Sequence, residues 1–148
     1  MPGQRASHAR RQGRFCVERG AAMKPNPMLL RSVTTVLPRY SYRFGSEVEL
    51  HKGIAQVLDG AGIGYQHEYV AGPQDRFDFL LDYGIVIEAK IKGSLGKALI
   101  QCSRYLQRPD VSAVVLVAAR QWAAYELDKA MTEAEKRIHI VRLKGAAF

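Results

Sequence analysis

The stretch that decides the fold is Arg76-Phe-Asp-Phe-Leu-Leu-Asp-Tyr-Gly-Ile-Val-Ile-Glu-Ala-Lys-Ile-Lys92. It predicts two β-strands joined by a tight turn at Asp82-Tyr83-Gly84. Successive side chains of a strand point to opposite faces. We therefore expect Asp78 on one face of the first strand and three apolar side chains on the other, namely Phe77, Phe79 and Leu81.

The second strand carries the same kind of alternation. Its apolar residues share one face: Ile85, Ile87, Ala89 and Ile91. Glu88, Lys90 and Lys92 share the opposite face, so two carboxylates and a lysine meet on one side of the hairpin. Charges inside a protein need compensation, and a divalent cation is the simplest partner for two carboxylates.

The spacing of Asp78, Glu88 and Lys90 resembles that of the PD-(D/E)xK nuclease superfamily, with Phe77 in place of the proline. The resemblance implies metal-dependent hydrolysis of DNA that leaves 5′-phosphate and 3′-hydroxyl ends. Asp78, Glu88 and the backbone carbonyl of Ala89 would bind Mg²⁺ or Mn²⁺, ions that prefer hard oxygen ligands. Lys90 would orient the attacking water or stabilise negative charge in the transition state.

The order of the predicted elements points to an α/β fold. Hydrophobic periodicity and capping residues predict helices over 46–61, 94–107 and about 121–134, and strands over 65–70, 111–118 and 137–143, besides the two strands of the hairpin. This order resembles the restriction-endonuclease-like core α-β-β-β-α-β, a mixed central sheet flanked by helices, over about residues 44–120.

Two further segments precede this core. Residues 1–27 are expected to be a disordered basic arm, and residues 28–148 a single domain, in which residues 28–44 form an irregular or short β lead-in. Met1 and Met23 both remain possible starts of the protein.

The first helix of the core offers another acid. Ser46 and Glu49 form an S-x-x-E capping box. Glu47 falls at the edge of the apolar stripe, which comprises Leu50, Ile54, Leu58 and Ala61. An acid on a packed face points to a role in the site, although a favourable charge at the helix N-terminus is an equal alternative.

The pattern Glu47-Val-Glu-Leu50 resembles the opening helix of archaeal-type Holliday-junction resolvases, whose first Glu belongs to the active site. His51, one helical turn after Glu47, is a further candidate, since RecB-type nucleases often use a histidine near this position as a ligand.

Gln101 and Tyr105 lie four residues apart and hence on one face of the second core helix. A QxxxY pattern after the E-x-K strand resembles the RecB-type branch of the superfamily, found in phage and in recombination and repair nucleases. There the Gln supports the metal site and the Tyr contacts DNA. Core packing of Tyr105 is an equal alternative.

The net charge of +8 and pI near 9.7 favour a polyanionic partner. Residues 1–22 hold five arginines and one glutamate, which gives +4 and leaves +4 for the remainder. We expect four basic residues of the domain to line a DNA groove, with a solvated surface as the alternative: Arg76, Lys92, Lys97 and Arg104.

The composition excludes several classes. The chain has no apolar run of about 18 residues and no secretory h-region, so no membrane partner is expected. Its two cysteines, Cys16 and Cys102, exclude a four-cysteine site within one chain and fit a cytoplasmic or nucleoid-associated protein. Two alternatives remain: a structure-specific Holliday-junction resolvase of the same fold acting as a homodimer, and a non-cleaving nucleic-acid-binding module of the same fold. Either one fits a larger recombination or repair assembly.

Overall fold

A five-stranded mixed β-sheet forms the centre of the protein in a computed structural model, which describes residues 23–119 and 137–146. The strand order is β2-β3-β4-β5-β6. The pairs β2–β3 and β3–β4 are antiparallel, and the pairs β4–β5 and β5–β6 are parallel. The strands are β2 (Tyr65–Val70), β3 (Arg76–Leu81), β4 (Ile85–Lys90), β5 (Ala113–Ala118) and β6 (Ile138–Arg142).

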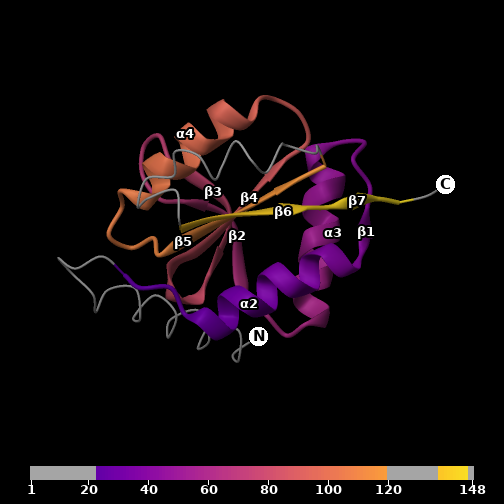
Figure 1. Cartoon of the computed structure of the whole chain (residues 1–148), viewed down its shortest axis with the longest axis horizontal. Coiled ribbons are helices and arrows are strands. Elements are labelled where there is room, and N and C mark those ends of the chain that lie inside the picture. The colour runs from indigo at the N-terminus through magenta and orange to yellow at the C-terminus, as the bar shows by residue number, and fades with distance from the viewer. Residues whose placement is uncertain (1–22, 120–136, 147–148) are drawn as a thin grey trace.

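Helices cover both faces of this sheet (Figure 1). Helices α2 (Pro27–Val36) and α3 (Glu47–Gly60) lie on one side, and α4 (Leu95–Leu106) lies on the other. Short elements complete the order: the 3₁₀ turns η1 (Leu37–Arg39) and η2 (Asp82–Gly84) and the parallel pair β1 (Ser41–Tyr42) and β7 (Lys144–Gly145). The predicted α/β class, with a mixed sheet flanked by helices, is confirmed.

The predicted ends of the two core helices agree closely with the structure. The Ser46 Oγ accepts a hydrogen bond from the Glu49 N–H at 3.1 Å, and the Ser94 Oγ accepts one from the Lys97 N–H at 3.2 Å. Each serine is therefore an N-cap that satisfies a free amide of the first helical turn. Between β3 and β4 the chain turns at Asp82–Gly84, as predicted, with Tyr83 at φ 60° and Gly84 at φ 70°.

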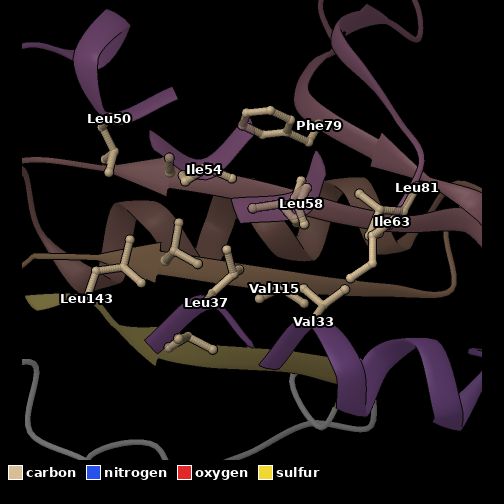
Figure 2. Close-up of a cluster of buried hydrophobic side chains, with 14 of the residues drawn as sticks. Val33, Leu37, Leu50, Ile54, Leu58, Ile63, Phe79, Leu81, Val115 and Leu143 are labelled. Carbon is tan, nitrogen blue, oxygen red and sulfur yellow. The ribbon is translucent and has the colours of Figure 1, made fainter. Parts of the chain in front are cut away.

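Two hydrophobic clusters hold the layers together. On the α2 and α3 side, the labelled side chains of Figure 2 interlock between both helices and the sheet. They are Val33, Leu37, Leu50, Ile54, Leu58, Ile63, Phe79, Leu81, Val115 and Leu143. On the α4 side, the buried residues include Phe77, Leu80, Val86, Leu95, Ala98, Cys102, Tyr105, Leu106, Val114 and Leu116.

Residues 28–44 differ from the irregular lead-in predicted for them, because most of this segment is helical. The Asn26 Oδ1 accepts a hydrogen bond from the Leu29 N–H at 3.0 Å, and Pro27 occupies the first turn of α2. Proline costs nothing at that position, since its missing N–H would have had no helical partner. Val33 and Leu37 are fully buried, so the helix is part of the core.

Met23, which the sequence placed in the disordered arm, packs against the domain. Met23 is buried, and its N–H donates to the carbonyl of Pro109 at 3.1 Å. The packed part of the chain therefore includes Met23. Residues 1–22 and the helix predicted over about 121–134 lie outside the described residues.

The predicted alternation along β3 is wrong at Phe77. Phe79 packs on the α3 side with Ile54, whereas Phe77 packs on the α4 side against Tyr105, with ring centroids 4.8 Å apart. The neighbouring strand changes its geometry at the same level, where Glu68 has a φ of 54°. A residue in this left-handed region breaks the regular pleat, so both strands switch faces here.

This switch coincides with the place where β3 leaves β4. The two strands pair at Phe79↔Ile87 and Leu80↔Val86, and pairing stops there, while β3 stays paired with β2 up to Arg76. Asp78 therefore lies beside a gap between two strands that are neighbours elsewhere.

Among the described residues, no helix is long and apolar enough to cross a membrane.

Candidate active site

Asp78 fills the gap between β3 and β4. Its Oδ2 accepts a hydrogen bond from the Ala89 N–H at 2.8 Å, in place of the ladder bond that the diverging strands no longer form. The N–H and C=O of one strand residue point to the same side of the strand. The carbonyl of Ala89 therefore faces the same gap as the carboxylate of Asp78.

Glu88 is the most buried acid of the site, with 2% of its surface exposed. Its Oε2 lies 3.4 Å from the Tyr105 hydroxyl, and its Oε1 is buried without a hydrogen-bond partner among the described residues. Burial and the nearby charge of Asp78 raise the pKa of Glu88 to about 9, although the charge of Lys90 opposes this shift. A second carboxylate beside Asp78 is thus costly unless a proton or a cation compensates it.

Gln101 and Tyr105 connect α4 to this acid. The Gln101 Nε2 donates to the Tyr105 hydroxyl at 2.8 Å, and that hydroxyl lies 3.1 Å from the carbonyl of Arg76. Tyr105 is only 1% exposed. Gln101 and Tyr105 therefore lie on one face of the helix, as predicted. Gln101 binds the Tyr105 hydroxyl, which in turn lies next to Glu88.

His51 approaches Asp78 from α3. It is buried, its Nε2 lies 3.5 Å from the Asp78 Oδ2, and this nitrogen has no hydrogen-bond partner among the described residues. The proximity of Asp78 raises the pKa of His51. Burial alone would raise the pKa of Asp78, but its contacts with His51 and Ala89 prevail and lower it.

Glu47 lies one helical turn before His51 on α3. Its side chain is exposed at the first residue of α3, whereas the packed stripe begins one turn later at Leu50. A role of Glu47 in the site therefore stays a prediction, whereas Ala61 as part of the buried stripe is wrong, since α3 ends at Gly60 and Ala61 is exposed. The negative charge of Glu47 also raises the pKa of His51, by less than the charge of Asp78 does.

Lys90 is half-buried at the end of β4. Lys92 lies beyond the last residue of this strand, so the alternation that placed it on the face of Lys90 does not extend to it. Lys97 is exposed in the first turn of α4. Both lysines are exposed, and their contact with DNA stays a prediction.

The two arginines of the predicted DNA groove form ion pairs on the surface. The Arg76 Nη2 lies 2.6 Å from the Glu68 Oε2, and the Arg104 Nε lies 3.0 Å from the Asp75 Oδ1. Both side chains are more than half exposed, at 61% and 51%. Exposed ion pairs of this kind are weak, so contact of either arginine with phosphate stays a prediction.

His67 and Glu68, to which the sequence assigns no role, lie next to the site. The His51 Nδ1 is 2.8 Å from the His67 Nε2, and His51, His67 and Glu68 bring ligand atoms within 4.8 Å of one another. His67 is 16 residues from His51 in the chain. No local signal connects the two, because only the pairing of β2 with β3 places His67 beside the helix.

Comparisons with protein-family models, curated proteins and solved structures gave no match for this chain. The arrangement of these residues is therefore the basis for assigning a function.

Proposed function

We propose that the protein is a metal-dependent nuclease of the PD-(D/E)xK type that hydrolyses phosphodiester bonds in DNA. The observation that carries this proposal is a pair of buried polar atoms, His51 Nε2 and Glu88 Oε1, on two residues that adjoin Asp78. Neither atom has a hydrogen-bond partner within residues 23–119 and 137–146. Buried polar groups are almost always satisfied, so such a pair beside a carboxylate supports a place for a bound cation.

The chemistry of the donor set fits a divalent cation. Asp78 and Glu88 offer carboxylate oxygens, Ala89 offers a carbonyl oxygen, and His51 offers an imidazole nitrogen. Carboxylates and carbonyls suit Mg²⁺ and Mn²⁺, and imidazole is also a ligand of Mn²⁺. When bound, such a cation polarises a phosphate and lowers the pKa of a bound water.

Lys90 stands at the edge of this donor set and is the protein's own positive charge there. In the nuclease it would orient the attacking water or stabilise the negative charge that develops on the phosphate oxygens. Its half-buried position allows contact with Glu88 and with a substrate at the same time.

Tyr105 serves in this proposal to position Glu88. A side chain that is 1% exposed is not available to contact DNA, whereas its hydroxyl is held by Gln101 and faces the Glu88 Oε2. The QxxxY pair would therefore fix the direction of the more buried acid. This role replaces the DNA contact that the resemblance implies for the tyrosine.

The fold and the charge add support. The order helix, three strands, helix, strand and the mixed sheet agree with the core expected for the restriction-endonuclease-like class. The net charge of +8 suits a DNA substrate. Glu47 is exposed, and the part in the site that the resolvase alternative gives it stays a prediction.

The test is cleavage of labelled single-stranded, duplex and four-way-junction DNA in Mg²⁺, Mn²⁺ or EDTA. Asp78→Asn keeps the shape of the side chain but removes its charge, so we expect metal-dependent cleavage by the unaltered protein and a loss of about 10²-fold or more in the variant. Asp59→Asn is the matched control, since Asp59 is exposed near the end of α3 and should leave cleavage unchanged. Equal rates for Asp78→Asn and the unaltered protein would refute the site.

A further inference from the structure

His51 and His67 form a pair beside the site, in which His51 is buried and His67 is exposed. Their rings meet edge to face with centroids 5.0 Å apart, and both rings also contact Phe79, at 5.4 Å and 4.8 Å. His51 is buried on α3, and His67 lies on β2 directly opposite Phe79 in the strand register. Because three rings from three elements restrain one another, the orientation of the His51 imidazole is set by the fold.

The two nitrogens of His51 have different surroundings. The Nδ1 lies 2.8 Å from the His67 Nε2, which is the length of a hydrogen bond. The Nε2 lies 3.5 Å from the Asp78 Oδ2, whereas a charge-assisted N–H···O bond measures about 2.7–2.9 Å. A neutral imidazole carries its proton on one nitrogen: on Nδ1 it can be donated to His67, and on Nε2 it points toward Asp78. Only a proton on Nδ1 leaves the Nε2 lone pair free to bind a cation.

We propose that His67 is a positioning residue that accepts the Nδ1 proton of His51 and so presents the Nε2 lone pair to the cation held by Asp78 and Glu88. This inference rests on the proposed function and adds His67, which acts through His51. Partners of this type fix the tautomer and orientation of a metal-binding histidine. A nitrogen ligand also favours Mn²⁺ over Mg²⁺, so the centre should prefer Mn²⁺.

Glu68 does not take the place of His67 in this arrangement. Its Oε2 is paired with the Arg76 Nη2 at 2.6 Å, which already supplies a positive partner to the carboxylate. The other arrangement that the geometry permits is a separate cation bound by His51, His67 and Glu68 themselves. The two arrangements differ in the number of ions bound and in the nitrogen of His51 that carries the proton.

The first measurement is Mn²⁺ binding by titration calorimetry with the full chain. His67→Leu removes the acceptor, and we expect it to weaken Mn²⁺ binding by about 10–100-fold and to reduce the preference for Mn²⁺ over Mg²⁺. His67→Gln should restore most of the affinity, because its side-chain carbonyl can accept the same proton. His139→Leu is the matched control, since His139 is half-buried on β6, at the opposite edge of the sheet, and should leave binding unchanged.

The second measurement locates the proton directly. Long-range ¹⁵N–¹H NMR of the metal-free protein, at a pH where the ring is neutral, should show the His51 proton on Nδ1. His67→Leu should shift this signature toward the other tautomer. A proton on Nε2 in the unaltered protein would overturn the proposal, whatever the activity of the enzyme.

The remaining outcomes separate this inference from the proposed function. Asp78→Asn and Glu88→Gln that bind Mn²⁺ as tightly as the unaltered protein would overturn both. If these two variants lose Mn²⁺ but a folded His67→Leu retains full affinity, the positioning role alone fails. Two bound ions, one of which is lost in His67→Leu, would make His67 a ligand and would likewise overturn the positioning role.

Discussion

Glu88 and Asp78 show how individual residues create the site. Both are acids brought to one gap, yet burial and the charge of Asp78 raise the pKa of Glu88, while His51 and Ala89 lower that of Asp78. Two neighbouring carboxylates whose pKa values are pushed apart are typical of functional sites. Glu88 is the more buried of the two, so its negative charge destabilises the fold unless a proton or a cation compensates it.

The buried acid predicts a dependence of stability on pH in the metal-free protein. The pKa of Glu88 is about 9 in the folded state and near 4.5 in the unfolded chain. The contribution of Glu88 to the free energy of unfolding is therefore fully present below pH 4.5 and is lost as the pH rises toward 9. In EDTA at pH 8, Glu88→Gln should therefore be more stable than the unaltered protein, by roughly 1–3 kcal/mol. The measurement is urea unfolding followed by circular dichroism at pH 6 and pH 8.

The same experiment in saturating Mn²⁺ should reverse the order. The unaltered protein should gain stability from the cation, and Glu88→Gln should gain little, because one ligand is missing. A Glu88→Gln variant that is equally destabilised at both pH values in EDTA would show that the carboxylate has a structural partner instead.

At the scale of elements, the site depends on strands and helices that end or change direction at defined residues. Glu68 and Asp78 lie at the level where β2 and β3 switch faces, and β3 parts from β4 at Phe79. Helix α3 supplies His51 and α4 supplies Gln101 and Tyr105 from opposite sides of the sheet. The gap between the strands is therefore closed by side chains from both layers.

Helix α2 belongs to the layer that supports α3, which leads to a prediction about stability. Leu37, which directly follows α2, is fully buried among residues of α3 and the sheet, so Leu37→Ala should lower the free energy of unfolding by about 2–5 kcal/mol. Met28, at the start of α2, is 81% exposed, and Met28→Ala should change it by less than about 0.5 kcal/mol. Urea denaturation distinguishes the two, and equal small effects would mean that this segment does not support the core.

At the scale of the whole molecule, charge is spread between the described domain and the preceding residues. Half of the net charge of +8 lies within residues 1–22, and the other half within residues 23–148. Electrostatic binding to DNA depends on the number of phosphates neutralised and weakens with salt. Both parts of the chain should therefore contribute to affinity without contributing sequence preference.

Removal of residues 1–22 tests this distribution. The truncated chain lacks five arginines, so the slope of log Kd against log salt concentration should decrease by up to about 4. Binding should be measured by fluorescence anisotropy with Asp78→Asn in both chains and in EDTA, where we expect no cleavage. An identical salt slope for the two chains would show that the arm does not contact DNA.

Much of this protein follows from local sequence patterns. The ends of α3 and α4, the turn at Asp82–Gly84 and the strands on both sides of it depend on residues close together in the chain. Capping, turn formation and strand alternation are interactions between near neighbours, so the sequence alone predicts them. The same local spacing places Asp78 and Glu88 on neighbouring strands and Gln101 and Tyr105 on one helix face, while their roles stay predictions.

The rest was decided by the tertiary structure. The face switch at Phe77, the exposure of Glu47 and the contact of His51 with His67 depend on where β3 leaves β4 and how α3 packs on the sheet. Contacts between residues far apart in the chain leave no local pattern, because burial and strand pairing determine them only after the layers have assembled.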